Sequence, residues 1–189
     1  MMDFSELLVK RRSIRNYDER EVPLETIQGI IRESCLAPSS GNGQPWKFIV
    51  VHNKDWIKKL SDESKKNLLQ AVEKNPMSPL KKYESALRDP AFNVFYNAPG
   101  VVYIGCSKGI RSAYVDCALA ACYFMFSAAA INLGTCWVAL GSSIEDSKIR
   151  QEIGMPEDYQ IIAPIIVGYP RIAPEKPVRN EPQILKIIT

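Results

Sequence analysis

Hydrophobic residues recur along the chain with two spacings, and each spacing is typical of one kind of secondary structure. Apolar positions three and four residues apart predict amphipathic helices, whereas short apolar runs between turn residues predict buried strands. Helical spacing covers residues 3–12, 23–34, 54–73, 111–133 and 144–153. Apolar runs cover residues 47–52, 101–106, 136–140 and 159–167. Because helices alternate with strands, we expect an α/β or α+β protein in which helices cover a sheet.

Turn and capping residues mark the ends of several of these elements. Pro23 stands at a favoured first-turn position of its helix. Gly134 is expected to stop the long apolar helix. Ser142 and Glu145 have the spacing of a capping box, which predicts that the last helix begins beside them.

Two proline-rich segments lie outside this pattern. Residues 75–99 hold four prolines, so they are expected to form at most short helices, and residues 75–97 are the best candidate for a mobile lid. The C-terminal extension, residues 170–189, ends in an apolar run over 184–188. An extension this apolar must pack on something, and the sequence leaves open whether that is its own sheet or a second subunit.

The composition is that of one globular domain. A chain of 189 residues with 46% hydrophobic and 24% charged residues can bury a core, which argues against disorder. A net charge of +3 does not indicate nucleic-acid binding, which needs basic residues gathered on one face. The apolar stretch 113–133 contains Asp116, so it predicts a buried helix or a subunit interface rather than a membrane span. The charged N-terminal segment does not resemble a signal peptide, and a cytoplasmic location is expected.

The chain has one histidine and five cysteines. A single histidine excludes a two-histidine metal site within the chain, and any Ser-His or Cys-His pair would have to use His52. His52 ends a predicted strand and is expected at the surface. The cysteines form no CxxC pair and mostly lie in apolar stretches, as reduced core cysteines do. We therefore expect no metal site, and chemistry that is not carried out by the chain's own side chains.

Four segments carry candidate binding chemistry. Residues 11–15 (RRSIR) place three guanidinium groups and a hydroxyl where they could hold a phosphate, although a solvated basic surface is the alternative. Residues 37–46 (APSSGNGQPW) could recognise a planar polar ring or a phosphate chain, or could simply connect a helix to a strand. Residues 134–141 run from a strand to a helix start, and the alternative is a plain buried strand with its turn. Lys176 and Arg179 in the extension are either further phosphate ligands or ordinary surface charges.

Together these segments resemble the nitroreductase family of FMN-dependent oxidoreductases. The likeness rests on residues 11–17 (RRSIRNY) followed by residues 37–48 (APSSGNGQPWKF), whose order and separation match those of the family. It extends over nearly the whole chain and leaves only residues 54–95 without clear family features. The resemblance implies one FMN-binding domain over residues 1–189, with a central, mostly antiparallel sheet flanked by helices in an α+β fold. It also implies an obligate, intertwined homodimer that exchanges C-terminal tails and holds two FMN molecules at its interface.

The resemblance also implies which residues surround the FMN: Arg11, Arg12, Ser13, Arg15, Pro38, Ser39, Ser40, Asn42, Val138, Ala139, Leu140, Gly141, Lys176 and Arg179. Those of the 11–15 segment would contact the phosphate, the ribityl chain and the N1–O2 edge of the flavin, and the two tail residues would complete the phosphate site. Those of the 38–42 loop would come from the other subunit or approach the ring edge. The 138–141 segment would lie along the ring, with the backbone N–H near Leu140 or Gly141 facing flavin N5.

The implied activity is the transfer of hydride from NADH or NADPH to a small planar acceptor, such as a nitroaromatic or a quinone, by a ping-pong mechanism. Candidates for stacking on a flat substrate are the aromatic residues Tyr83, Phe92, Phe95 and Tyr96. A deiodinase-like activity is not expected, because the Glu and Tyr four residues apart in the lid of that branch have no counterpart here. Two alternatives stay open: a flavin-cannibalising enzyme that makes a cobalamin ligand, and a non-catalytic flavin-binding redox module.

Overall fold

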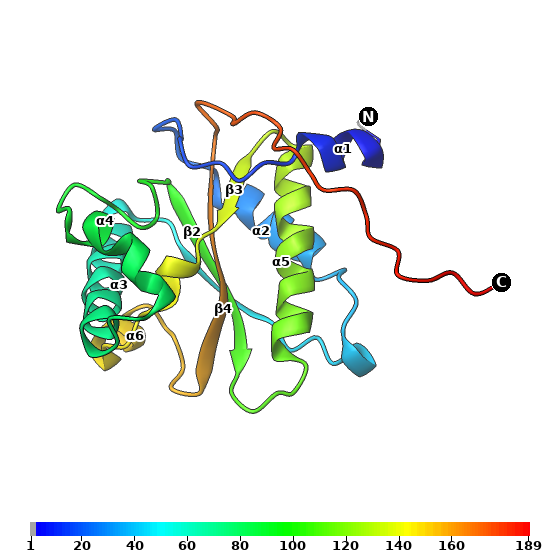
Figure 1. Ribbon diagram of the computed structural model, residues 1–189. Coiled ribbons are helices and arrows are strands. Elements are labelled where there is room, and N and C mark those ends of the chain that lie inside the picture. Colours follow the sequence, from blue (N-terminus) through cyan, green and yellow to red (C-terminus); the bar gives the residue numbers. More distant parts are fainter. Residues whose placement is uncertain (1–2) are drawn as a thin grey trace.

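A four-stranded antiparallel sheet lies at the centre of the protein in the computed structural model, which describes residues 3–189 (Figure 1). Its strands are β1 (Lys47–Val51), β2 (Gly100–Ser107), β3 (Gly134–Trp137) and β4 (Tyr159–Gly168), in the order β1-β2-β4-β3. Every neighbouring pair is antiparallel. Of the two fold classes left open by the alternation of elements, the chain therefore has the α+β class.

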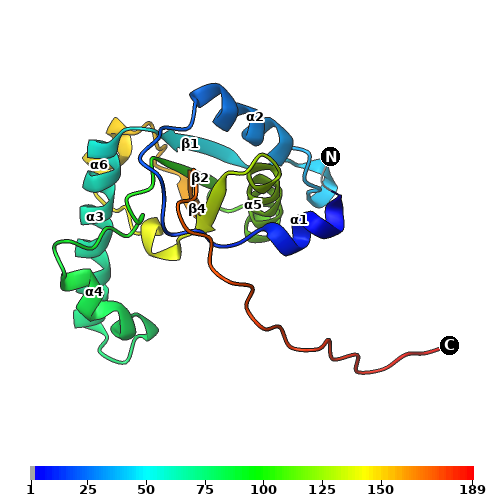
Figure 2. The ribbon, with the colours of Figure 1, turned by 90° about the horizontal axis from the view of Figure 1, so that it is seen from above.

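Helices cover both faces of the sheet, as the view from above shows (Figure 2). One face carries α5 (Ala113–Ala130) with α2 (Leu24–Ser34) beside it, and α1 (Phe4–Lys10) packs on α5. The other face carries α3 (Lys54–Lys74), on which α4 (Glu84–Arg88) packs, and α6 (Ser147–Glu152) is joined to α3 by a Lys59–Glu152 ion pair of 2.7 Å. Three short 3₁₀ helices complete the elements: η1 (Ser40–Asn42), η2 (Pro79–Tyr83) and η3 (Ala139–Ser142).

The central strand β2 contributes to two separate cores. Its side chains alternate between the faces of the sheet, because successive residues of a strand point to opposite sides. Val102 and Ile104 pack in the core below α5 and α2, whereas Val101 and Tyr103 pack in the core below α3. A strand that is buried on both sides reads as a continuous apolar run, which is why the sequence predicted it.

Helix α5 is the apolar helix of the first core. It is the one helix of residues 3–189 that is long and apolar enough to cross a membrane, a test that core helices also pass. Its buried residues, among them Cys117 and Phe124, pack against α2 and the sheet, as expected for a buried helix. Asp116 in its first turn is buried as well, and its Oδ1 accepts a hydrogen bond of 3.0 Å from the Ser40 N–H.

Most elements expected from the hydrophobic pattern are confirmed, and the main errors lie between residues 130 and 146. Helix α5 ends at Ala130, and Asn132 rather than Gly134 has the left-handed conformation that often follows a helix (φ 64°). The strand expected over 136–140 is β3, which spans Gly134–Trp137 and is followed by the 3₁₀ helix η3. The apolar run continues to Leu140, so its pattern does not reveal the turn.

The predicted capping box at Ser142 and Glu145 is also wrong. The Ser142 hydroxyl donates to the carbonyl of Ala139 at 2.8 Å and so closes η3. Helix α6 begins at Ser147, after Asp146, whose Oδ1 accepts a hydrogen bond of 3.0 Å from the Ile149 N–H. Asp146 is thus the N-cap, a role for which aspartate is well suited.

Three further expectations have clear outcomes. Residues 75–97 contain the short helices η2 and α4, as expected for a segment with several prolines. His52 is half-buried rather than exposed, because its ring packs beside Gly100, and its Nε2 has no hydrogen-bond partner among the described residues. Residues 171–189 are exposed throughout and run away from the body (Figures 1 and 2), so the extension does not pack on its own sheet.

We expect Gly105→Ala to destabilise the fold by about 1–3 kcal/mol, because an added Cβ would overpack the sheet. That Cβ would lie 2.1 Å from the carbonyl oxygen of Gln160, at the bulge between Ile104 and Gly105. The matched control is Gly29→Ala in α2, where the nearest atom would be 3.9 Å away. The control should stabilise the helix by about 0.5–1 kcal/mol. Urea unfolding measures both, and equal midpoints for the two variants would contradict the prediction.

Candidate functional site

Residues 11–17 cross the end of the sheet beside β3 as an extended segment. The Ile14 N–H donates to the carbonyl of Thr135 at 2.9 Å, and Ser13 pairs with Thr135 as an isolated bridge. Gly134 makes room for this crossing, because a Cβ there would lie 2.7 Å from the Ile14 side chain. The buried Tyr17 hydroxyl donates to the Ile14 carbonyl at 2.7 Å, and burial raises the pKa of Tyr17, so that it keeps its proton.

The extended backbone places Arg11, Ser13 and Arg15 on one side of the segment, since alternate side chains share a side. All three lie near the buried thiol of Cys136: burial raises its pKa, whereas Arg15, Ser13 and Arg11 oppose that rise. Within residues 3–189 neither Arg11 nor Arg15 forms an ion pair with a carboxylate. Arg12 alternates to the other side, and its Nη1 donates to the backbone carbonyl of Arg11 at 2.7 Å. Three of the four residues expected in this segment are thus brought together.

A pocket opens next to Arg15. The Arg15 guanidinium lies 5.6 Å from the centre of the Tyr96 ring, and Phe92 meets the same ring edge-on at 5.9 Å. Tyr96 and Asn97 both have left-handed backbone angles (φ 54° and 53°), which is a strained arrangement for two non-glycine residues. The pocket has a volume of about 800 Å³ and lies between this strained turn, residues 15–19 and the start of α3.

The four aromatic candidates for substrate stacking differ in their surroundings. Phe92 and Tyr96 are half-buried and line the pocket. Tyr83 is exposed beside Lys82 on η2. Phe95 is fully buried and packs against Gly141 and Tyr103, so it supports the site from below and cannot reach a substrate.

The segment 138–141 turns sharply after β3 and leaves two of its backbone donors, the N–H groups of Ala139 and Leu140, without an acceptor in residues 3–189. The Val138 N–H donates to Pro164 at 2.8 Å, and the Gly141 N–H donates to the Val138 carbonyl at 2.9 Å. Gly141 is pressed against Phe95, where a Cβ would lie 2.3 Å from the ring. Within the described chain the half-buried Leu140 N–H has no acceptor. Of the two amides expected to face a flavin, only that of Leu140 is therefore available.

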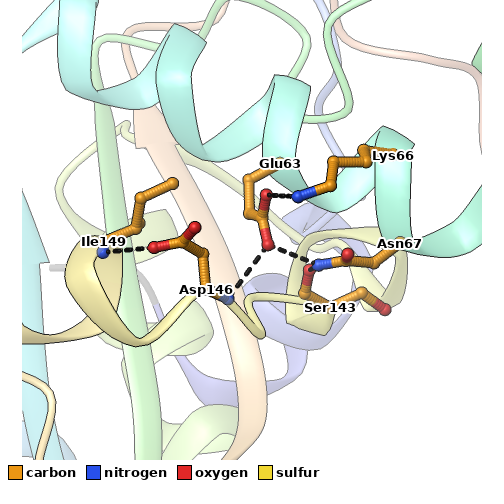
Figure 3. A network of polar contacts seen from close by, with 6 residues as sticks. All are labelled: Glu63, Lys66, Asn67, Ser143, Asp146 and Ile149. Carbon is orange, nitrogen blue, oxygen red and sulfur yellow. Dashed lines mark hydrogen bonds and ion pairs between the residues drawn. The ribbon is translucent and has the colours of Figure 1, made fainter.

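Helix α3 contributes a polar network that the sequence reasoning missed (Figure 3). Glu63, Ser64 and Asn67 are buried and form hydrogen bonds to the backbone of the segment that follows β3. A signal was present in the sequence, because Ser61, Ser64 and Asn67 recur every third residue on the side of the helix that carries Leu60 and Leu68. Polar residues on a buried helix face need partners, and here the partners are backbone groups of the site.

The loop that carries Pro38, Ser39, Ser40 and Asn42 lies at the opposite end of α5 from the segment that follows α1 (Figure 1). Ser40 is bound by Asp116 at the start of the helix, whereas Ser13 pairs with Thr135 beyond the helix end. Asp116 and Ala130 are 14 residues apart in α5. At 1.5 Å per residue this is about 21 Å of helix. Within one chain the loop therefore does not meet the arginine segment.

Lys176 and Arg179 do not reach the site within one chain either. Both belong to the exposed extension, which leaves the body beside Tyr17 and Asn16. Among residues 3–189 no group of three or more His, Cys, Asp or Glu side chains is arranged to hold a metal ion. What the body of the chain does bring together is Arg11, Ser13 and Arg15, on the segment beside β3, whereas the free Leu140 N–H lies on the turn that follows the same strand.

The donor set fits the phosphorylated flavin that the sequence led us to expect. Two guanidinium groups without carboxylate partners and a hydroxyl suit a phosphate, which is bound best by charge-assisted donors. A free backbone N–H on a rigid turn suits the acceptor edge of a planar ring. The residues present therefore accommodate an FMN.

Comparison with known proteins shows which proteins this chain is similar to. A nitroreductase with bound FMN from Bacteroides fragilis has a similar structure, with a TM-score of 0.83 and 23% identity, over 98% of this chain and 100% of that one. A protein of Archaeoglobus fulgidus with a provisional NADH dehydrogenase/NAD(P)H nitroreductase name is 28% identical over 178 residues, 90% of this chain and 87% of that protein. Iodotyrosine deiodinase 1 of Rattus norvegicus is 28% identical over 179 residues, 89% of this chain but 62% of that longer protein.

The fold and the sequence thus lead to the same assignment. The sheet and its two helical layers match nitroreductase structures along their whole length. The sequence model of the nitroreductase family matches residues 8–169, from α1 to the end of β4. This chain therefore belongs to the nitroreductase family.

Proposed function

We propose that this protein is an FMN-dependent oxidoreductase that takes hydride from NADH or NADPH and reduces small planar acceptors, such as nitroaromatics or quinones. The observation that carries the proposal is the grouping of Arg11, Ser13 and Arg15 on one side of an extended segment, without carboxylate partners in residues 3–189. Bound FMN would supply the hydride-accepting and hydride-donating chemistry. The chain's own residues bind and orient it.

Each part of the site has a distinct role in this proposal. Arg11 and Ser13 hold the phosphate and the ribityl chain, and Arg15 lies at the N1–O2 edge of the ring. A cation there favours the reduced flavin, which gains negative charge at that edge. The Leu140 N–H faces N5. The pocket beside Arg15 gives the hydride donor and the acceptor room to bind in turn, which is the basis of a ping-pong mechanism.

We further propose that the active form is a homodimer whose two copies share each FMN. The loop 38–42 and the arginine segment lie at opposite ends of α5, so one copy cannot place both on the same flavin. A second copy could supply Pro38, Ser39, Ser40 and Asn42 from its loop and Lys176 and Arg179 from its tail. Exposed apolar residues on α1 and α5, including Phe4, Leu8, Tyr114 and Val115, support an interface on this side.

The exposed extension supports the same assembly. Its large apolar residues lie in water in the single chain, and they are Ile172, Val178, Ile184, Leu185, Ile187 and Ile188. Burying this surface on a partner would stabilise the dimer by the hydrophobic effect. Exchange of the two tails achieves that burial and carries the basic residues of each tail to the other copy.

Purified protein should be yellow, with the visible absorption of bound FMN, and should lose that colour when NADH or NADPH is added without oxygen. Steady-state rates with a quinone or a nitroaromatic should give the parallel reciprocal plots of a ping-pong mechanism. A colourless protein that takes up no FMN on titration would contradict the proposal. Stable FMN binding without turnover would favour the redox module, and dimethylbenzimidazole formed from reduced FMN and oxygen would favour the flavin-cannibalising enzyme.

Arg11→Ala should weaken FMN binding by about 1.5–3 kcal/mol, which is roughly 10- to 150-fold in Kd, because a hydrogen bond to a charged group is lost. Titration of the FMN-free protein, followed by flavin fluorescence, measures the change. Arg32→Ala is the control, since Arg32 is an exposed arginine in the last turn of α2. The control should bind FMN like the unaltered protein, and equal weakening in both variants would argue against a phosphate site at Arg11.

Deletion of residues 171–189 should convert the dimer to a monomer and abolish tight FMN binding, because the shared interface and the tail cations are both lost. The double variant Lys176→Ala/Arg179→Ala should stay dimeric and lose only FMN affinity, since it retains the apolar tail residues. Size-exclusion chromatography with light scattering gives the mass, and FMN titration gives the affinity. A truncated chain that remains dimeric would rule out the tail as the main dimer contact.

A further inference from the structure

The structure assigns a positioning role to three residues of α3, namely Glu63, Ser64 and Asn67, which we call the anchor face. They hold the Leu140 N–H toward the flavin. This inference rests on the proposed function, because it concerns the amide that would face N5. The three residues are positioning residues, since they act through the backbone of residues 140–146 and do not themselves reach the cofactor.

The anchor face binds the segment after β3 at three regularly spaced points, and Figure 3 shows the two at Ser143 and Asp146. The Ser64 hydroxyl donates to the Leu140 carbonyl, and the Asn67 side-chain amide donates to the Ser143 carbonyl at 2.8 Å. Glu63 Oε1 accepts a hydrogen bond of 3.0 Å from the Asp146 N–H. The helix thus holds every third residue of the segment, and the first of these residues carries the free N–H.

Glu63 and Asn67 are also bonded to each other, and all three side chains are withdrawn from water. Asn67 donates to Glu63 Oε1 at 2.7 Å, and Lys66 pairs with Glu63 Oε2 at 3.2 Å. Burial alone would raise the pKa of Glu63, but the hydrogen bonds from Asn67, the Asp146 N–H and Lys66 hold that pKa below its usual range. If the segment moved, the buried Ser64 hydroxyl would lose its one partner, and Glu63 and Asn67 would each lose a backbone partner, which is costly for buried polar groups.

A second contact restrains the segment by packing. Gly141 lies against the Phe95 ring so closely that no side chain would fit between them. Phe95 is fully buried and meets Tyr103 of β2 edge-on, so it cannot yield. The segment is therefore bonded to α3 and packed on Phe95, and Leu140 has little freedom to turn its N–H away.

A fixed N–H donor treats the two oxidation states of a flavin differently. Oxidised N5 has a lone pair and accepts a hydrogen bond, whereas N5 of the doubly reduced, protonated ring is itself a donor and would face another donor. A rigidly held Leu140 N–H therefore favours the oxidised state and lowers the reduction potential of the bound FMN. Loosening the anchor face should let the segment turn and should raise that potential.

The test compares Ser64→Ala with Ser61→Ala in the FMN-loaded protein. Ser61 is an equally buried serine on the same helix, one turn earlier, and its hydroxyl accepts from the Val94 N–H, away from Leu140. Equilibration with a redox dye gives the midpoint potential of each variant. We expect Ser64→Ala to strengthen the binding of reduced FMN several-fold relative to that of oxidised FMN, and so to raise the midpoint potential. A tenfold change in this ratio equals about 30 mV for a two-electron couple. Ser61→Ala should keep the original potential.

Two substitutions at Glu63 separate anchoring from charge. Glu63→Gln keeps an oxygen that accepts from Asp146 and Asn67, so it should retain the original potential, whereas Glu63→Ala should raise it. If Glu63→Ala does not fold, the comparison between Ser64→Ala and Ser61→Ala still tests the positioning role.

Unchanged potentials in every FMN-loaded variant, or equal shifts in Ser64→Ala and Ser61→Ala, would overturn the positioning role and leave the proposed function intact. Failure of the unaltered protein to bind FMN would instead overturn the proposed function, and the positioning role with it.

Discussion

The passage of residues 13–18 across the end of the sheet is the contact on which the rest of the structure depends. Two glycines permit it, because a Cβ at Gly134 would meet Ile14 at 2.7 Å and a Cβ at Gly168 would meet Tyr17 at the same distance. The segment joins β3 through Ile14 and Thr135, and joins the chain beyond β4 through the Asp18 N–H and the Tyr169 carbonyl. One short stretch thereby closes the sheet edge, turns Ser13 and Arg15 to one side and determines where the extension leaves the body.

The parts of the fold that the sequence predicted are those whose residues carry their own pattern. Helix α2 has a stripe of isoleucines and a terminal serine that pack on α5, and strand β2 has apolar residues that enter both cores. In such elements local preference and burial agree, so the spacing of apolar residues alone identifies them. The 11–15 segment was also found as a candidate, because three guanidinium groups and a hydroxyl suit a phosphate, and so was the 134–141 segment, because it runs from a strand to a helix start.

The missed features depend on residues that are distant in the sequence. Nothing near Leu140 shows that the chain turns there; the turn is stabilised by Phe95 below Gly141 and by the bond from Val138 to Pro164. Asp146 rather than Ser142 caps α6, and the Asp146 N–H is itself held by Glu63 on another helix. Arg12 cannot be separated from its neighbours by composition, since only the extended backbone shows that it alternates to the other side.

The separation of the 38–42 loop from the arginine segment has a consequence for how the protein behaves in dilute solution. A binding site that is completed by a second copy exists only when the copies are associated, so ligand binding and association are linked by mass action. The apparent affinity for FMN would then rise with protein concentration, and bound FMN would in turn hold the copies together. Diluting such a protein would release its colour, and adding free FMN would restore both the colour and the assembly.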